Sequence, residues 1–304
     1  MVNQVAESKS SKPETFLAML QRTNLLFLLV GVLFVIFIVT KNPLVGILAG
    51  VTFIAIFVID IMSGVEEHGL KEELVGIAKA AAVAIVFWVV LIVIMDSASP
   101  LSGIVTCSML PRYERGDMIL LHGVKNFSDI NAPTIEMSKA EFDEMYGKQN
   151  VACGQMGALE YLCSHDLCQR LSKNGTPLEK ESLCAIGLKY NNTSYYENYS
   201  NDVIVYVPKQ YNSNTSILGM DIIHRVFAKI KVGDEYFFLT KGDNNQVFDS
   251  YWFEIVPEQA VKGKVALRLP FIGYFKLFIT SSFYTGLGVD PAGCEKIYER
   301  AKLK

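Results

Sequence analysis

Residues 221–245 read DIIHRVFAKIKVGDEYFFLTKGDNN, and the fold predicted for this protein follows from this stretch. Two runs rich in β-branched and aromatic residues, 222–230 and 236–240, lie on either side of the turn-forming residues 231–234 (KVGD). Apolar runs of this length that flank a glycine-containing turn are typical of an antiparallel hairpin. We therefore expect this stretch to form two paired strands of a β-sheet domain.

Further short β-like runs lie on both sides of this hairpin, at 118–121, 203–207 and 261–269. Together with the hairpin they predict an all-β domain of antiparallel sheets over residues 96–280. A C-terminal tail is expected over residues 281–304.

One part of this domain, residues 123–200, lacks the strand pattern. It is polar and rich in cysteines, and only 138–145 resembles a helix. We interpret it as an insertion. The apolar stretch 271–279 is too short to cross a bilayer. We expect it to pack in the domain or to lie at the membrane interface.

The N-terminal third carries three long apolar runs, at 24–40, 44–62 and 75–95. A membrane-spanning helix needs about 20 apolar residues, with a range of about 17–25. Residues 24–95 are therefore expected to form an α-helical membrane anchor of three spans, with a tight hairpin at 41–43.

The basic residues predict the orientation of this anchor. Lys9, Lys12 and Arg22 precede the first span, whereas the first loop holds only Lys41 and the second Lys71. Short loops rich in Lys and Arg stay in the cytoplasm. Residues 1–23 are thus expected to be a cytoplasmic tail, and everything after residue 95 to be extracytosolic.

The cysteines and glycosylation motifs fit an extracytosolic domain. Cys153, Cys163, Cys168 and Cys184 cluster in the insertion, whereas Cys107 and Cys294 lie apart from them. The cluster predicts two disulfides with three possible pairings. A zinc site that includes His165 is the alternative, but the spacing matches no familiar zinc pattern. Asn-x-Ser/Thr motifs occur at Asn126, Asn174, Asn191, Asn192, Asn198 and Asn214.

The net charge is −3, and no basic stripe is interleaved with aromatic residues, so nothing favours nucleic-acid binding. Several residues with reactive side chains stand out, although each has an ordinary structural interpretation. Ser108 resembles a polar turn residue, and His224 resembles a core histidine in a strand. Asp243 lies in a Gly-Asp-Asn-Asn turn, and Asp249 follows six residues later.

Taken together, these segments resemble a known family. The order Ser-Met-x-Pro (108–111), Arg-Gly-Asp (115–117), His-Arg-Val (224–226) and Lys-Gly-Asp-Asn-Asn (241–245) is similar to the archaeal and endoplasmic-reticulum branch of type I signal peptidases. The later segments Lys-Gly-Lys-Val (262–265) and Leu-Pro-Phe-Ile-Gly-Tyr (269–274) add to the likeness. The resemblance covers about residues 100–122 and 200–280. Cys107 stands where this family usually has glycine, and the insertion is longer than usual.

The resemblance implies a serine protease that removes signal peptides from preproteins. Ser108 would be the nucleophile and His224 the general base. Either Asp249 or Asp243 would orient the imidazole, and Asp249 is preferred because Asp243 is suited to bonding its own turn. The Ser108 backbone N–H and the Thr106 hydroxyl are the candidate oxyanion donors.

The expected partners are signal peptides and the lipid bilayer, with translocation machinery or accessory subunits as further candidates. No metal or organic cofactor is implied. Two alternatives remain open. One is a related membrane serine protease with a different surface-protein substrate, and the other is an inactive membrane glycoprotein of the same fold.

Overall fold

The computed structural model describes residues 25–274 apart from 41, 147, 149, 165–182 and 210–220. The described residues divide into two compact units, 25–80 and 81–274. The expected tails at 1–23 and 281–304 lie outside the described residues, as do Cys168, Cys294, Asn174 and Asn214.

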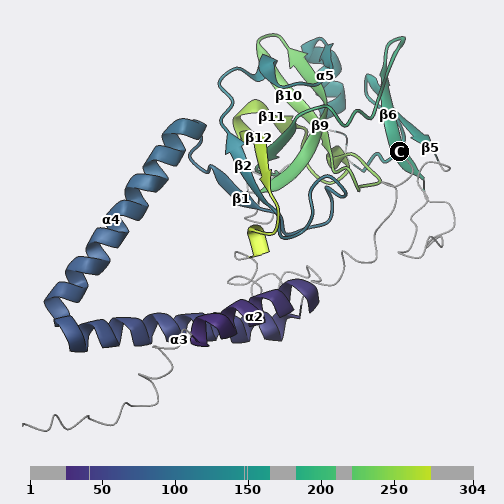
Figure 1. The fold of residues 1–304 in the computed structure, drawn as a ribbon. Helices are drawn as coiled ribbons and strands as arrows, with labels where there is room; N and C mark the ends of the chain where they lie inside the picture. Colours follow the sequence, from purple (N-terminus) through teal and green to yellow (C-terminus); the bar gives the residue numbers. More distant parts are fainter. Residues whose placement is uncertain are drawn as a thin grey trace, which may run out of the picture. The chain divides into compact units, whose positions relative to one another are not determined.

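Three apolar helices precede the β domain (Figure 1): α2 (Leu25–Thr40), α3 (Pro43–His68) and α4 (Leu70–Met95). Asn42 caps α3 by accepting a hydrogen bond from the Leu44 N–H at 2.9 Å, and Pro43 occupies the first helical position. A Cβ atom at Gly46 would lie 3.0 Å from the Phe37 ring, so the glycine allows α2 and α3 to pack closely.

Two of these helices, Leu44–His68 and Leu70–Met95, are long and apolar enough to cross a bilayer. The apolar part of α2 is shorter, at Leu26–Phe37. The expected loop between the second and third spans is wrong, because α3 and α4 meet at Gly69 alone. Glutamate, lysine and leucine in residues 63–74 favour helix, and only Gly69, with φ +86°, breaks it.

The larger sheet contains the predicted strands. Its path is β1 (Leu101–Gly103), β2 (Met118–His122), β12 (Val261–Leu269), β8 (Val203–Tyr206), β9 (Ile222–Val232), β10 (Glu235–Lys241) and β11 (Val256–Pro257). Neighbours on this path are antiparallel, and β3 (Thr134–Glu136) pairs with β9 in parallel. The hairpin predicted from 222–240 is therefore confirmed as β9 and β10.

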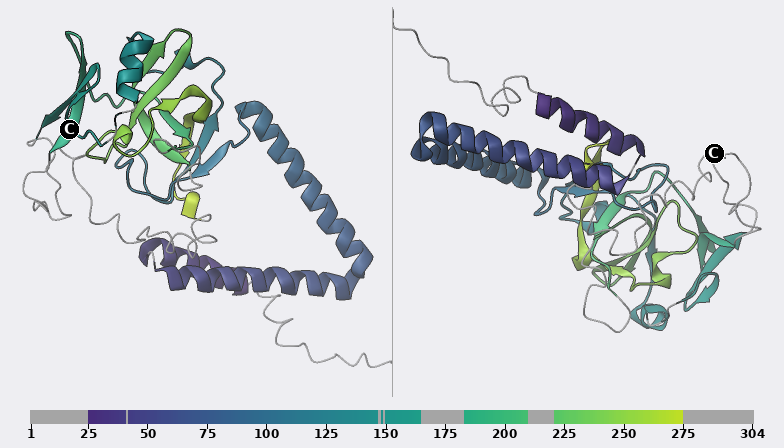
Figure 2. Two further views of the ribbon diagram at one scale, coloured as in Figure 1. Left: turned by 180° about the vertical axis from the view of Figure 1, so that it is seen from behind. Right: turned by 90° about the horizontal axis from the view of Figure 1, so that it is seen from below.

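The expectation that residues 123–200 contain no strands is wrong. They form a second antiparallel sheet of β4 (Gly154–Met156), β5 (Leu159–Ser164), β6 (Cys184–Tyr190) and β7 (Thr193–Tyr196). Glycines and cysteines interrupt the alternation in these short strands, which obscures it in the sequence. The expected helix is present as α5 (Lys139–Tyr146). In Figures 1 and 2 the β5–β6 hairpin lies to one side of the larger sheet.

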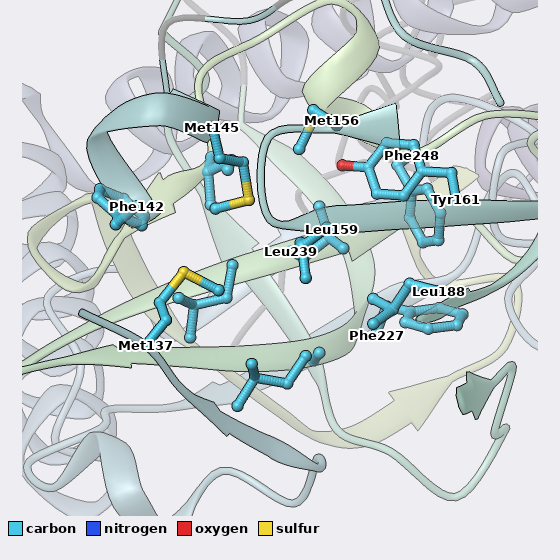
Figure 3. Packing of buried hydrophobic residues seen from close by; sticks show 14 of the residues in the cluster. Met137, Phe142, Met145, Met156, Leu159, Tyr161, Leu188, Phe227, Leu239 and Phe248 are labelled. Carbon is cyan, nitrogen blue, oxygen red and sulfur yellow. The ribbon is translucent and has the colours of Figure 1, made fainter. Parts of the chain in front are cut away.

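A shared hydrophobic core joins the second sheet and α5 to the larger sheet (Figure 3). Its buried members include Met137, Phe142, Met145, Met156, Leu159, Tyr161, Leu188, Phe227, Leu239 and Phe248. Because these residues come from both sheets, the insertion belongs to the same folded unit as the larger sheet.

One hydrogen bond ties the end of α4 to the β domain. The Gly123 N–H, just after β2, donates to the Met95 carbonyl at 2.8 Å. A Cβ atom at Gly123 would lie 1.8 Å from the Asp96 carbonyl oxygen, so only glycine fits there.

The shared core gives a direct stability prediction. Leu188→Ala in β6 should lower the free energy of unfolding by about 2–5 kcal/mol, because a fully buried leucine leaves a cavity. Leu267→Ala in β12 is the matched control, since Leu267 is 51% exposed, and should change it by less than about 0.5 kcal/mol. Denaturant unfolding of the solubilised protein, followed by circular dichroism, measures both. Equal effects of the two variants would contradict a continuous core.

Candidate active site

Ser108 lies in the turn that follows β1, and a second turn holds its backbone in place. The Asn244 N–H donates to the Ser108 carbonyl at 2.7 Å, and the Asn244 side-chain amide donates to the Cys107 carbonyl at 3.1 Å. A Cβ atom at Gly242 would lie 2.7 Å from the Ser108 carbonyl oxygen. Glycine is thus required at 242 for the two turns to approach this closely.

His224 lies in β9, opposite Ile204 of β8, and is only 6% exposed. Its Nε2 atom is 2.9 Å from the Ser108 Oγ atom. This is hydrogen-bond distance between a serine hydroxyl and a histidine that are 116 residues apart in sequence.

Asp249 contacts the other side of the imidazole. It begins the short helix η3 (Asp249–Tyr251), and its Oδ2 atom is 2.6 Å from His224 Nδ1. Asp249 is buried, so this contact is shielded from water. An aspartate that accepts from Nδ1–H leaves Nε2 free to face the serine.

Asp243 is bound to Arg225 instead of to His224. The Arg225 Nε and Nη2 atoms donate to the two carboxylate oxygens of Asp243, each at 2.7 Å. The remaining Nη1 donates to the carbonyls of Tyr199 and Asn201. Burial tends to lower the pKa of Arg225, but the hydrogen bonds and charge of Asp243 outweigh it, so the pKa is raised and the guanidinium stays charged.

Sequence reasoning missed Tyr206. Its hydroxyl donates to Asp249 Oδ2 at 2.8 Å, and the Thr240 hydroxyl donates to the Tyr206 oxygen at 3.2 Å. Burial, followed by the charge of Asp249, raises the pKa of Tyr206 well above its usual value, so the phenol stays neutral. The strand register explains its position: Tyr206 is two residues after Ile204, which is opposite His224, so Tyr206 and His224 lie on the same face of the sheet.

The second candidate oxyanion donor is also close to the serine. The Thr106 Oγ1 atom is 3.2 Å from Ser108 Oγ. A pocket of about 240 Å³ adjoins both residues. It is lined by Gly103, Ile104, Val105, Thr106, Ser108, Met109, Asp221, Ile222, Ile223 and His224.

The described cysteines are all in disulfides. Cys153 pairs with Cys163, and both Cys107 and Cys184 are disulfide-bonded. Cys107, which the sequence set apart, therefore presents no thiol beside Ser108. Among the described residues no cluster of His, Cys, Asp and Glu is suited to a metal ion.

The fold and the site together define a mainly antiparallel β protein with two membrane-length helices and a chain of hydrogen bonds that runs from a half-buried serine through a buried histidine to a buried aspartate. The order of these groups is that of a Ser-His-Asp triad. No protein-family model matches the chain.

Curated proteins with a related sequence do exist. The chain is 28% identical over 97 residues to the signal peptidase complex catalytic subunit SEC11 of Metarhizium acridum, covering 31% of the chain and 52% of that protein. It is 29% identical over 97 residues to SEC11 of Metarhizium robertsii, covering 31% and 52%. It is 28% identical over 95 residues to SEC11 of Colletotrichum graminicola, covering 30% and 51%. The chain thus spans about half the length of the curated relatives it matches.

The Arg225–Asp243 pair predicts that Asp243 is needed for stability. Asp243→Asn should lower the free energy of unfolding by about 3–5 kcal/mol, because it leaves the buried Arg225 without a carboxylate partner. Asp234→Asn, in the exposed β9–β10 turn, is the control and should change it by less than about 0.5 kcal/mol. Denaturant unfolding measures both, and wild-type stability of Asp243→Asn would argue against a structural role.

Proposed function

We propose that this protein is a membrane-anchored serine endopeptidase of the signal peptidase type, which removes N-terminal signal peptides from exported preproteins. The observation that carries this proposal is the hydrogen-bonded chain Ser108–His224–Asp249, in which three distant segments meet in the order of a triad. The similarity to SEC11 catalytic subunits supports the choice of substrate.

In the proposed mechanism, Ser108 Oγ attacks the scissile carbonyl while His224 Nε2 accepts its proton. Asp249 holds the Nδ1–H and stabilises the imidazolium that forms. His224 then donates the proton to the leaving amine, and an acyl ester remains on Ser108. Water, deprotonated by His224, hydrolyses this ester and restores the serine. The mechanism uses no metal or organic cofactor.

The Ser108 N–H and the Thr106 hydroxyl are proposed as donors to the oxyanion. Thr106 lies beside Ser108 Oγ, where it can turn from the serine hydroxyl to the developing negative charge. Donors of this kind typically contribute about 10²–10³ in rate.

The substrate is proposed to bind as an extended strand. β1 is an edge strand of the larger sheet, and the pocket beside it leads to Ser108. Main-chain hydrogen bonds to an edge strand give affinity, whereas pockets for alternate side chains give specificity. The pocket walls include Ile104, Met109 and Ile223, which suit small apolar side chains before the cut.

The β domain is proposed to be extracytosolic, on a three-span anchor in the archaeal cell membrane or the endoplasmic reticulum. Its disulfides fit an oxidising compartment. The described motif asparagines Asn126, Asn191, Asn192 and Asn198 are all exposed, as acceptors of a glycan must be. Since the relatives are named as subunits of a complex, accessory subunits are proposed as partners alongside the bilayer.

The decisive test is preprotein processing by the detergent-solubilised protein. Ser108→Ala and His224→Ala should each abolish cleavage, and the double variant should be no worse than either one, since groups that act as a unit are strongly non-additive. Ser99→Ala, at an exposed serine, is the control and should process normally. Cleavage by Ser108→Ala would refute the proposed mechanism. A wild-type protein that cuts another membrane substrate but no preprotein would instead identify a different protease.

Asp249→Asn should slow the chemical step by on the order of 10⁴, because it favours the wrong imidazole tautomer. Its stability should stay near that of the wild type. Single-turnover cleavage and denaturant unfolding together separate this variant from Asp243→Asn, which should lose stability. If Asp249→Asn processed normally while Asp243→Asn were stable but inactive, the roles of the two aspartates would be reversed.

A further inference from the structure

Tyr206 is the last residue of β8, and it is completely buried. Its hydroxyl donates to Asp249 Oδ2, the same oxygen that contacts His224 Nδ1. A phenol has one proton to donate. Because Thr240 donates to the Tyr206 oxygen, that proton is directed at Asp249.

We propose that Tyr206 is a positioning residue that sets the basicity of His224 through Asp249. This inference rests on the proposed function, since it gives Tyr206 a part in activating Ser108. The hydrogen bonds described for Tyr206 join it to Asp249 and Thr240, and none joins it to Ser108 or His224.

The first part of the argument is geometric. A carboxylate held by one donor can rotate about its Cβ–Cγ bond and present either oxygen. Two donors that converge on Oδ2 from β8 and β9 fix which oxygen faces the imidazole. Thr240 of β10 in turn fixes the phenol, so three neighbouring strands determine the orientation of one carboxylate.

The second part is electrostatic. In a buried site, a carboxylate whose only partner is an imidazole strongly favours the protonated imidazole and so raises the histidine pKa. A second donor stabilises the carboxylate and so weakens this attraction. With Tyr206 present, His224 therefore stays neutral, and able to act as a base, at lower pH than it would without it.

Three other charged groups near the site are held in ion pairs. Arg225 of β9 is bound to Asp243, and Lys241 of β10 is bound to Glu197. Asp221, which lines the same pocket as His224, is 2.8 Å from Lys262 of β12. Removing the Tyr206 hydroxyl leaves all three pairs unchanged, so a change in histidine pKa would report on the Asp249 contact.

The test measures the imidazole directly. The chain has four histidines, so ¹⁵N-histidine labelling of the full-length protein in detergent gives few signals, and His224→Ala identifies that of His224. The macroscopic pKa of the His224–Asp249 pair should be higher by about 1 in Tyr206→Phe than in the wild type. The pKa rises because Tyr206→Phe removes a hydrogen-bond donor that stabilises the ionised Asp249 carboxylate. Without that donor, the carboxylate attracts the proton of the imidazole more strongly.

Tyr161→Phe is the matched control. Tyr161 is 2% exposed, and its hydroxyl contacts Ser250 Oγ at 2.8 Å, one residue beyond Asp249 in the chain. The substitution thus removes a phenol hydroxyl of similar burial beside the same segment, and the contact at 2.8 Å that it removes is to Ser250. The His224 pKa should not change in this variant.

Thr240→Val gives a second route if Tyr206→Phe does not fold. It keeps Tyr206 but releases the phenol from its donor, so the His224 pKa should rise by a smaller amount. In preprotein cleavage, the acid limb of the pH profile should move upward with the pKa in both variants, while the rate at high pH stays within a few-fold of wild type.

The proposal is overturned if the His224 pKa is unchanged or lower in a folded Tyr206→Phe or Thr240→Val, or if Tyr161→Phe raises it equally. Loss of activity at every pH without a change in pKa would mean a structural role only. Because the titration needs no substrate, it stands apart from the proposed function, which fails on its own if Ser108→Ala still processes preproteins.

Discussion

Arg225 and Asp243 are both buried, and their bidentate ion pair connects the strand that carries His224 to the turn that holds Ser108. Arg225 follows His224 directly in β9, so its side chain points to the opposite face of the sheet. Asp243 belongs to the turn that holds the Ser108 backbone through Asn244. The position of the serine relative to the histidine therefore depends on this pair. A buried guanidinium needs hydrogen-bond acceptors for its N–H groups, and the carbonyls of Tyr199 and Asn201 are the further acceptors here.

The insertion supports the same site from the other direction. Its backbone and side chains contact the segment that carries Asp249 at several points. The Ala185 N–H donates to the Gln246 carbonyl at 2.8 Å, the Tyr161 hydroxyl contacts Ser250, and the Tyr146 hydroxyl donates to Glu254. The polar segment that the sequence predicts as an insertion is therefore in contact with the segment that carries Asp249.

Features that depend on local sequence were predictable. Short runs of β-branched and aromatic residues identified β2, β8, β9, β10 and β12, but not β1, β3 or β11, of the larger sheet. Long apolar runs identified the two membrane-length helices. The C-terminal end of α3 and the N-terminal end of α4 lie outside the apolar runs, and their charged residues favour helix without marking a membrane span. The second sheet was missed because its strands are short and its partners lie far apart in sequence.

The candidate site was only partly predictable. Ser108 and His224 were selected by resemblance, and the structure brings them to hydrogen-bond distance, although their catalytic roles stay predictions. Turn chemistry favours Asp249 over Asp243, and Asp249 is the aspartate that contacts His224. The partner of Asp243 could not be predicted from its turn, because its carboxylate is bound by Arg225 of β9. Tyr206 lies in the run 203–207 that predicts a strand, but nothing in that run indicates its contact with Asp249, which depends on the pairing of β8 and β9.

The glycine joint between α4 and β2 has a mechanical consequence. The Gly123 N–H donates to the Met95 carbonyl, and the two segments approach too closely for any side chain at position 123. In a bilayer crossed by α4, the chain from residue 95 to residue 108 would then set the distance between the membrane surface and the serine. If the proposed function holds, a peptide emerging from the same membrane would be cut where it reaches the serine. The cleavage site would then depend on distance from the membrane as well as on side chains.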